Sequence, residues 1–224
     1  MLELSRESPL QSGHSNSMNM SYGGDTLNSA VYLARQGIAV DYVTALGDDP
    51  MSAWMVQQWR AEGVACDLID FQPNAVPGMY LIENDQKGER SFYYWRDNAP
   101  ARGLFDDTSR AEQLFAQLAD RAWVCLSGIT LAIYSDSSRQ RLFGLLADYR
   151  NGGGKVIFDS NYRARLWSGL DVAQRAYETM YKLTDVALPT IEDEQQLFGD
   201  VDQESIISRL QSWGVGEIVL KMGE

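Results

Sequence analysis

Two glycines stand directly before an amphipathic helical pattern in the stretch SYGGDTLNSAVYLARQG, residues 21–37. Apolar residues recur in this stretch at helical spacing, at Leu27, Ala30, Val31 and Ala34. Because Gly23 and Gly24 carry no side chain, a ligand can approach the backbone closely, and the helix that follows would point free N–H groups at it. Asp25 and Asn28 add side-chain partners for hydroxyl groups, which suits a small polyhydroxy ligand. An ordinary glycine turn before a helix is the alternative.

The composition limits the possible functions. The chain has 224 residues, enough for one sizeable core or two small ones, and its net charge of −12 argues against nucleic acid or an anionic membrane as a partner. Cys66 and Cys125 stand outside any CxxC or metal-type spacing, which favours free thiols in a reducing compartment. No apolar run reaches membrane-spanning length and no leader is recognised, so we expect a cytoplasmic protein. The single histidine, His14, makes histidine catalysis improbable.

Helical patterns and short apolar runs alternate along most of the chain, which predicts an α/β fold with a parallel sheet covered on both faces. The expected strands are 40–44, 123–126, 156–158, 186–188 and 217–220. The expected helices are 25–36, 51–62, 111–120, 137–151, 172–183, 192–198 and 204–213. Because both ends of the sequence read as strands, we expect a fragment of a longer domain.

One segment departs from this alternation. The runs 77–83 and 90–96 are strand-like and are joined by a polar link, which is typical of a β-hairpin. Strand alternation places Phe92, Tyr94 and Arg96 on one face. Tyr80 and Ile82 share a face of the other strand. Phenol groups beside a guanidinium suit a carboxylate, which indicates a sugar acid rather than a neutral sugar. A sheet edge without a binding role is the alternative.

Polar residues also follow the later strands. Asp159, Asn161, Arg163 and Arg165 come directly after the apolar run 156–158. Ligands gather at the carboxyl ends of strands in open α/β sheets, so two arginines there can bind a carboxylate or phosphates, although Asp159 can instead orient Arg163 structurally. Acidic residues at 192–194 open a helix, where they either complement its dipole or hold Mg²⁺ through water. Lys221 and Gly223 end the last strand and weakly indicate a nucleotide pocket.

Taken together, these segments resemble the ribokinase-like (PfkB) carbohydrate kinases, and most closely the branch that acts on 2-keto-3-deoxygluconate. The supporting runs span nearly the whole chain and are GGDTLN (23–28), YVTALGDD (42–49), PGMYLIE (77–83), GERSFYYWR (88–96), LSGI (126–129), FDSNYR (158–163), LW (166–167) and KMG (221–223). The resemblance implies a three-layer α/β/α fold with a central, mostly parallel sheet and a small β-lid. It makes residues 1–224 a single domain, incomplete at both termini, with a lid formed by about 1–22 and 74–98. It implies ATP-dependent transfer of the γ-phosphoryl group to a primary sugar hydroxyl, with ATP and Mg²⁺ as cofactors.

The resemblance also assigns residues by position. It implies sugar-hydroxyl contacts for Gly23, Gly24, Asp25 and Asn28. It implies ketoacid contacts for Tyr80, Tyr94, Arg96 and Arg163. The nucleotide side falls to Asn161, Arg163, Lys221 and Gly223. Thr190 and Asp193 stand where many relatives have Asn-x-x-Glu, so Asp193 is a candidate for a Mg²⁺ role.

One family motif does not occur in the sequence. The family carries Gly-Ala-Gly-Asp, whose aspartate is the catalytic base and whose N–H groups form the anion hole. We therefore expect the base downstream of Glu224, name no catalytic residue in this chain, and expect the 224-residue chain to be inactive while its full-length parent is a kinase.

Other functions remain open. The chain can belong to a kinase for a neutral sugar such as fructose, which the two arginines argue against. It can also be a non-catalytic module that binds sugar or forms a homodimer through the lid. A dinucleotide-binding enzyme is disfavoured because no GxGxxG follows an early strand. The expected partners are a sugar acid and ATP, with no nucleic acid and no membrane.

Overall fold

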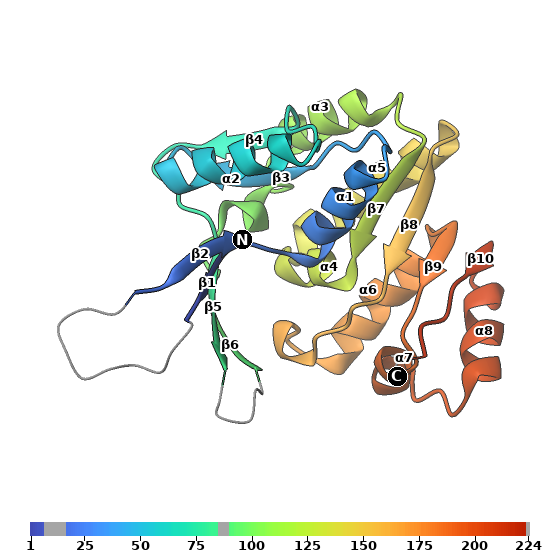
Figure 1. Ribbon diagram of the computed structural model, residues 1–224. Helices are drawn as coiled ribbons and strands as arrows, with labels where there is room; N and C mark the ends of the chain where they lie inside the picture. Colours follow the sequence, from blue (N-terminus) through green and yellow to red (C-terminus); the bar gives the residue numbers. More distant parts are fainter. Residues whose placement is uncertain (7–16, 85–89, 223–224) are drawn as a thin grey trace. The chain divides into compact units, whose positions relative to one another are not determined.

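The computed structural model describes residues 1–6, 17–84 and 90–222 (Figure 1). The chain divides into two compact units, an N-terminal unit of residues 1–104 and a C-terminal unit of residues 105–224. Helices alternate with a mostly parallel set of strands, so the predicted α/β class is confirmed. No helix within the described ranges is long and apolar enough to cross a membrane.

The N-terminal unit contains a sheet whose described strands lie in the order β2 (Asn19–Tyr22), β1 (Leu2–Ser5), β5 (Met79–Asn84) and β6 (Arg90–Trp95). Strands β5 and β6 pair antiparallel, which confirms the predicted hairpin, whereas β1 and β5 are parallel. The register aligns Glu3 of β1 with Tyr80 of β5, and Tyr80 with Tyr94 of β6. These three residues therefore form one row across the sheet.

The same unit packs two helices on an apolar core. Helix α1 (Asp25–Arg35) and helix α2 (Pro50–Ala61) accompany a parallel strand pair, β3 (Thr44–Gly47) and β4 (Ile69–Gln72), and the short 3₁₀ helix η1 (Pro100–Gly103). The core is built from Leu27, Val31, Met55, Val56 and Trp59 with their neighbours. The Asp49 side chain caps α2 by accepting hydrogen bonds from Met51 N at 2.9 Å and Ser52 N at 3.2 Å.

The predicted strand 40–44 was wrong in its position. The pairing with β4 starts at Thr44, opposite Ile69, and continues to Gly47. Residues before it make only an isolated bridge between Asp41 and Ala65. Val40 and Tyr42 are apolar because they pack against the core, not because they belong to the ladder.

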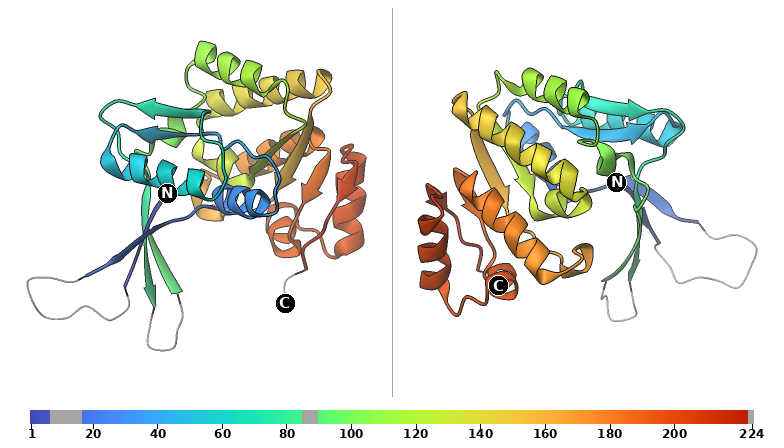
Figure 2. Two further views of the ribbon diagram at one scale, coloured as in Figure 1. Left: turned by 45° about the horizontal axis from the view of Figure 1, so that its top comes forward. Right: turned by 180° about the vertical axis from the view of Figure 1, so that it is seen from behind.

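The C-terminal unit is built on parallel strands in the order β10 (Glu217–Ile218), β9 (Val186–Leu188), β8 (Lys155–Asp159) and β7 (Trp123–Ser127). Its helices are α3 (Thr108–Leu118), α4 (Gly128–Ile133), α5 (Asp136–Asn151), η2 (Ala164–Leu166), α6 (Leu170–Lys182), α7 (Ile191–Phe198) and α8 (Gln203–Ser212). Figure 2 shows α5 and α6 side by side over one face of this sheet. A cluster of edge-to-face rings, Phe158, Tyr177 and Tyr181, ties α6 to β8.

Candidate functional site

The row of Glu3, Tyr80 and Tyr94 contains two of the predicted substrate residues, and a third, Arg96, lies beside Tyr94. The ring centroids of Tyr80 and Tyr94 are 5.8 Å apart, and the guanidinium carbon of Arg96 lies 4.4 Å from the centroid of the Tyr94 ring. Phe92 stacks on Tyr94 at 6.4 Å. The prediction that these side chains share one face of the hairpin is confirmed. A cation against a phenol ring, with a second phenol beside it, can hold both a carboxylate and hydroxyl groups.

Gly23 lies directly against this row. A Cβ atom at Gly23 would stand 2.1 Å from the Tyr80 Oη atom and 3.3 Å from Glu3 Oε2. The absence of a side chain is therefore required by a protein neighbour, the Tyr80 phenol. Gly24 is needed for a different reason, since its φ of +152° falls where L-residues rarely lie. The sequence interpretation attributed both glycines to the approach of a ligand.

Helix α1 begins at Asp25 with Gly24 as its N-cap residue, and no side chain caps it. Its first-turn N–H groups therefore receive no acceptor from the N-cap residue, and Asp25 stands in the first turn. Asn28 is exposed, and its backbone N–H donates to Gly24 O at 2.8 Å. The predicted hydroxyl-binding residues thus lie together at the start of α1.

A second group of predicted residues lies at the carboxyl ends of β8 and β9. The Asp193 carboxylate is buried, and its Oδ2 atom accepts hydrogen bonds from Ser160 Oγ at 2.9 Å and from Tyr162 N at 3.0 Å. Ser160 Oγ in turn accepts from Thr190 N at 3.1 Å. Asp193 therefore joins the loop after β8 to the first turn of α7.

Arg163 extends from this loop. Its Nη1 atom donates to the Tyr162 carbonyl at 2.7 Å and lies 4.0 Å from Asp193 Oδ1, while about half of the side chain remains exposed. Asn161, two residues earlier, has a φ of +31°, in the left-handed region that asparagine tolerates better than most residues. The loop thus turns sharply after Ser160 and presents Arg163 at its surface.

Lys221 meets the same end of the sheet. Its Nζ atom donates to Asp159 Oδ1 at 2.6 Å, and its backbone forms a bridge with Thr190. The alternative in which Asp159 orients Arg163 gains no support, because the partner given by the structure is Lys221. Gly223, the other residue expected on the nucleotide side, lies outside the described residues.

The fit of these residues to Mg²⁺ is limited. Within residues 1–6, 17–84 and 90–222, no group of three or more His, Cys, Asp or Glu side chains gathers around one point. Asp193 Oδ2 already has two donors. The neighbouring Glu194 is fully buried and accepts hydrogen bonds from Tyr181 and, at 2.8 Å, from Arg209. A cation here would depend on phosphate oxygens and water for most of its ligands.

The sequence interpretation missed several residues of these two clusters. Glu3 accepts a hydrogen bond from the Tyr80 hydroxyl, and Ser160 holds Asp193. Gly128 leaves room for the Tyr177 hydroxyl, because a Cβ there would lie 1.8 Å from it. Tyr177 Oη donates to the Ser160 carbonyl at 2.6 Å and so fixes the start of the loop. For Glu3, the available signal was its alternation with Leu2 and Leu4.

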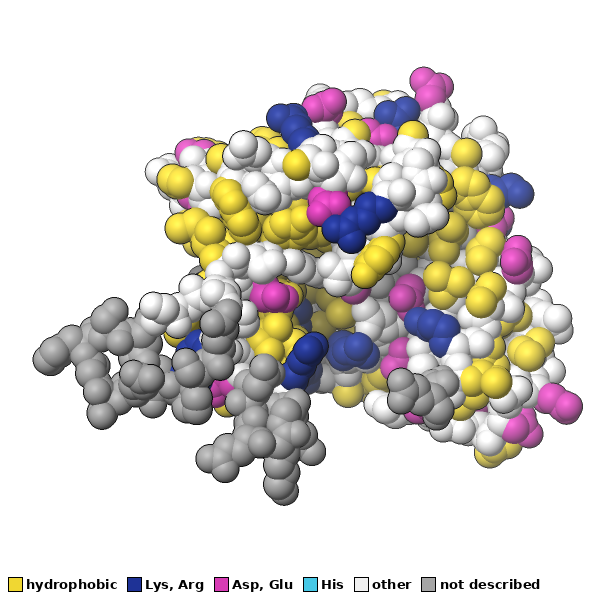
Figure 3. Space-filling view, in the orientation of Figure 1, with side chains coloured by type: hydrophobic (Ala, Val, Ile, Leu, Met, Phe, Trp, Pro, Cys, Tyr) yellow, Lys and Arg dark blue, Asp and Glu magenta, His cyan; other side chains and the backbone are white. Residues whose placement is uncertain are grey.

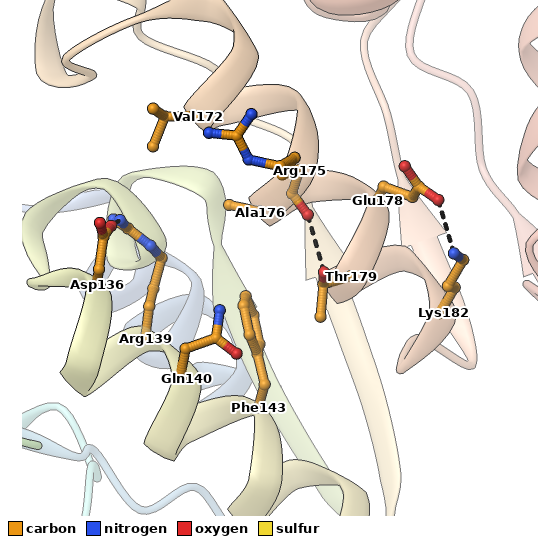
Figure 4. Close-up of a pocket in the computed structure, with 10 residues that line it drawn as sticks. All are labelled: Asp136, Arg139, Gln140, Phe143, Val172, Arg175, Ala176, Glu178, Thr179 and Lys182. Carbon is orange, nitrogen blue, oxygen red and sulfur yellow. Dashed lines mark hydrogen bonds and ion pairs between the residues drawn. The ribbon is translucent and has the colours of Figure 1, made fainter.

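A separate groove of about 390 Å³ lies between α5 and α6 (Figure 4). Its charged side chains are paired with neighbours on their own helices, as in the ion pairs Asp136–Arg139 and Glu178–Lys182. The Arg139 guanidinium also donates to the Leu131 and Tyr134 carbonyls at 3.0 and 2.9 Å. We therefore assign no ligand to this groove.

Acidic and basic side chains are interspersed over the face of the molecule shown in Figure 3.

Comparison with known proteins gives a consistent result. The family model described as pfkB family carbohydrate kinase matches residues 2–224. A 2-dehydro-3-deoxygluconokinase of Dickeya dadantii is 45% identical over 210 residues, covering 92% of this chain and 67% of that protein. The protein of the same name from Escherichia coli K12 is 44% identical over 206 residues, covering 90% of this chain and 66% of its own. The chain thus spans about two thirds of the length of these relatives.

The fold comparison agrees with the sequence comparison. The crystal structure of a PfkB protein from Polaromonas sp. JS666 superposes with a TM-score of 0.88 at 23% identity, covering all of this chain and 74% of that one. This likeness supports the fold, and the predicted ribokinase-like class is confirmed. The chain therefore belongs to the pfkB family of carbohydrate kinases.

Proposed function

We propose that this chain belongs to an ATP-dependent kinase that phosphorylates 2-keto-3-deoxygluconate, the acid also called 2-dehydro-3-deoxygluconate, at its 6-hydroxyl group. The names of the relatives at 44–45% identity support this substrate. The observation that carries the proposal is the face on which Tyr80, Tyr94 and Arg96 stand together, with the guanidinium 4.4 Å from the Tyr94 ring centroid. A neutral sugar has no group that needs this cation.

Different residues are assigned to different groups of the substrate. Arg96 is assigned to the carboxylate, because a guanidinium can donate two parallel hydrogen bonds to it. Arg163, in the C-terminal unit, keeps the ketoacid role that the sequence resemblance implies for it. Gly23, Gly24, Asp25 and Asn28 are assigned to the hydroxyl groups, since they lie at the uncapped start of α1. Tyr80 and Tyr94 are assigned to the chain of the ketoacid between these ends.

ATP is the phosphoryl donor in this proposal, and Mg²⁺ enters as the counter-ion of its phosphates. A fold relative from Escherichia coli, a putative ribokinase II, was solved in complex with ATP and Mg²⁺. On this chain the nucleotide side is assigned to Asn161, Arg163, Lys221 and Gly223, and Asp193 holds the loop that carries the first two. Phosphoryl transfer depends on positioning and on neutralising charge, which basic side chains and Mg²⁺ supply.

The 224 residues hold no side chain that we assign as the base, so we propose that the chain as given does not turn over substrate. Extension to the length of the relatives would restore activity. The test is a coupled assay of ADP release with 2-keto-3-deoxygluconate, fructose, ribose and no sugar, on the 224-residue chain and on an extended form. Turnover by the 224-residue chain would refute the first statement, and an extended form that prefers fructose would refute the substrate.

Fructose is the second candidate, because a fructokinase of Escherichia coli is 27% identical over 188 residues, covering 84% of this chain and 59% of that protein. The assay above separates the two substrates directly. A variant Arg96→Met adds a second readout, since it should weaken binding of the acid and leave binding of fructose unchanged.

We also propose that residues 1–22 and 74–98 act as a lid and can pair two copies of the chain. The sheet face opposite the Tyr80 row carries the register-aligned residues Met20, Leu4, Leu81 and Tyr93. Met20 and Tyr93 are exposed, at 41% and 48%. A two-fold contact through such a face would bury apolar area. Sedimentation tests this, because a strict monomer at high concentration would contradict it.

A further inference from the structure

Glu3 adds a group to the N-terminal site that none of the assignments above includes. It lies opposite Tyr80 in the parallel pairing of β1 with β5, so the sheet register fixes the two side chains as neighbours. The Tyr80 hydroxyl donates to Glu3 Oε2. The same carboxylate oxygen lies 3.3 Å from the position that a Gly23 Cβ would take. Strands β1 and β5 and the glycine segment between β2 and α1 therefore meet at this oxygen.

The Tyr80 phenol has little freedom to leave this partner. Tyr80 is only 8% exposed, and its ring is flanked by Phe92 at 6.3 Å and Tyr94 at 5.8 Å between centroids. The Tyr80 Oη atom occupies the space that a side chain at position 23 would fill. The hydroxyl is thus held between a carboxylate and bare backbone.

This arrangement fixes the direction of the hydrogen bonds. A phenol has one proton to donate, and an ionised carboxylate has none. Since the Tyr80 proton goes to Glu3, the phenol oxygen keeps only its accepting capacity. A ligand group that meets this oxygen must bring its own proton, as a hydroxyl group does and an ionised carboxylate does not.

The positions of the charged side chains also favour a hydroxyl group, and not a carboxylate, beside Tyr80. Glu3 stands at one end, on β1, and Arg96 follows β6 at the other end, with its guanidinium over the Tyr94 ring. A ligand with a carboxylate at one end and hydroxyl groups at the other is attracted in one orientation and repelled in the reverse. The row therefore has a polarity that suits such a ligand.

We infer that Glu3 is a positioning residue that determines specificity: by taking the Tyr80 proton, it makes Tyr80 an acceptor for a substrate hydroxyl and directs the substrate carboxylate to the Arg96 end of the row. The inference rests on the proposed function and goes beyond it, since it states which end of the sugar acid meets which end of the sheet. Glu3 acts through Tyr80 and does not itself contact the substrate.

The first experiment needs no ligand. In tyrosine-labelled 224-residue chain, proton NMR at low temperature should show a slowly exchanging hydroxyl proton that disappears in Tyr80→Phe. In Glu3→Gln the signal of this proton should change its chemical shift, or broaden because the proton exchanges faster with solvent. Tyr93, 48% exposed on the same hairpin, provides the control through Tyr93→Phe. A Tyr80 proton that exchanges as fast as that of Tyr93, or one that Glu3→Gln leaves unchanged, would overturn the inference.

The second experiment measures binding by calorimetry, with 2-keto-3-deoxygluconate and a series of analogues that each lack one hydroxyl. One analogue should bind the wild-type chain about tenfold more weakly, as expected when a buried acceptor loses its donor. Tyr80→Phe should abolish that difference. Glu3→Gln should reduce it, because the amide can donate to the phenol oxygen and compete with the substrate. Glu112→Gln, which removes an exposed charge on α3, should leave it unchanged.

A double-variant cycle separates positioning from contact. If Glu3 acts on the substrate hydroxyl through Tyr80, then in the Tyr80→Phe background Glu3→Gln no longer changes the discrimination between the substrate and that analogue. An effect that persists there, or an equal loss for every analogue, would overturn the inference. If the chain binds fructose in place of the acid, the proposed substrate is wrong. The inference is then tested with deoxyfructoses: it requires that one of them bind more weakly and that Tyr80→Phe abolish this difference, and it is overturned if no such analogue exists. A wild-type chain that binds neither class overturns both.

Discussion

Substitution of Gly23 by alanine tests the N-terminal site at its most crowded point. The added Cβ atom would stand 2.1 Å from Tyr80 Oη, whereas ordinary van der Waals contacts of a Cβ begin at 3.4 Å. The shift required is therefore more than 1 Å. Neither side can yield easily, because Tyr80 is buried among aromatic rings and Gly23 N donates to Met1 O at 3.1 Å between β2 and β1.

Overpacking of this kind costs about 1–3 kcal/mol, and we expect Gly23→Ala to lower the free energy of unfolding by that amount. The same substitution in Tyr80→Phe should cost less than about 1 kcal/mol, because the closest atoms would then be Tyr80 Cζ and Glu3 Oε2, both at 3.3 Å. The coupling between the two positions should therefore be on the order of 1 kcal/mol.

Urea unfolding followed by tryptophan fluorescence and by far-UV circular dichroism gives the four free energies of this cycle. Gly144→Ala in α5 is the matched control, since a Cβ at Gly144 meets nothing within 4 Å and alanine favours a helix. It should leave the chain as stable or stabilise it slightly. Additive effects of Gly23→Ala and Tyr80→Phe would refute the reasoning, because they would show that the phenol is not what excludes a side chain.

Three further predictions concern single side chains. Asp193→Asn should lower the free energy of unfolding by about 1–3 kcal/mol, since it disturbs two buried hydrogen bonds, and a stable variant with a changed Mg²⁺ dependence would instead show a metal ligand. Burial tends to raise the pKa of Asp185, but hydrogen bonds from the Arg150 guanidinium and the Val156 N–H outweigh this and hold the pKa below its usual 3.8. The ionised Asp185 therefore stabilises the fold above pH 3.8, and this stabilisation is lost as the pH falls through the lowered pKa. The free energies of urea unfolding of the wild type and of Asp185→Asn should therefore converge in acid. Arg96→Met should weaken calorimetric binding of the sugar acid by about 2 kcal/mol or more and leave fructose unaffected, and equal losses would contradict the assignment.

The helices were predictable because their periodicity is local. The helix expected at 25–36 runs from Asp25 to Arg35, and the one expected at 137–151 runs from Asp136 to Asn151. Strand β2 was missed, since its residues are mostly exposed and show no apolar alternation. Helix α4 was also missed, because six residues directly after a strand give too short a pattern.

The site was predictable within one hairpin and not across strands. Period-two alternation correctly placed Tyr94 and Arg96 on one face. The neighbour relation of Glu3 and Tyr80 depends on the register of β1 with β5, which are far apart in the sequence, and no local pattern specifies that register. The partners of Asp193 were hidden for the same reason, since Ser160 lies in a loop after another strand.

A carboxylate in a site proposed for an anionic substrate needs a physical account, and the width of the sheet provides one. Neighbouring strands lie about 4.8 Å apart, so Glu3 on β1 and Tyr94 on β6 are separated by about 10 Å. At an effective dielectric constant of about 20, two like charges repel by about 1.7 kcal/mol at 10 Å and by about 4 kcal/mol at 4 Å. A substrate carboxylate beside Arg96 therefore meets a weak repulsion that salt screens further, while one beside Glu3 meets a strong repulsion. The difference of about 2 kcal/mol is enough to favour one orientation by more than tenfold, so Glu3 can lower the affinity for the acid slightly and still improve the selection of its orientation.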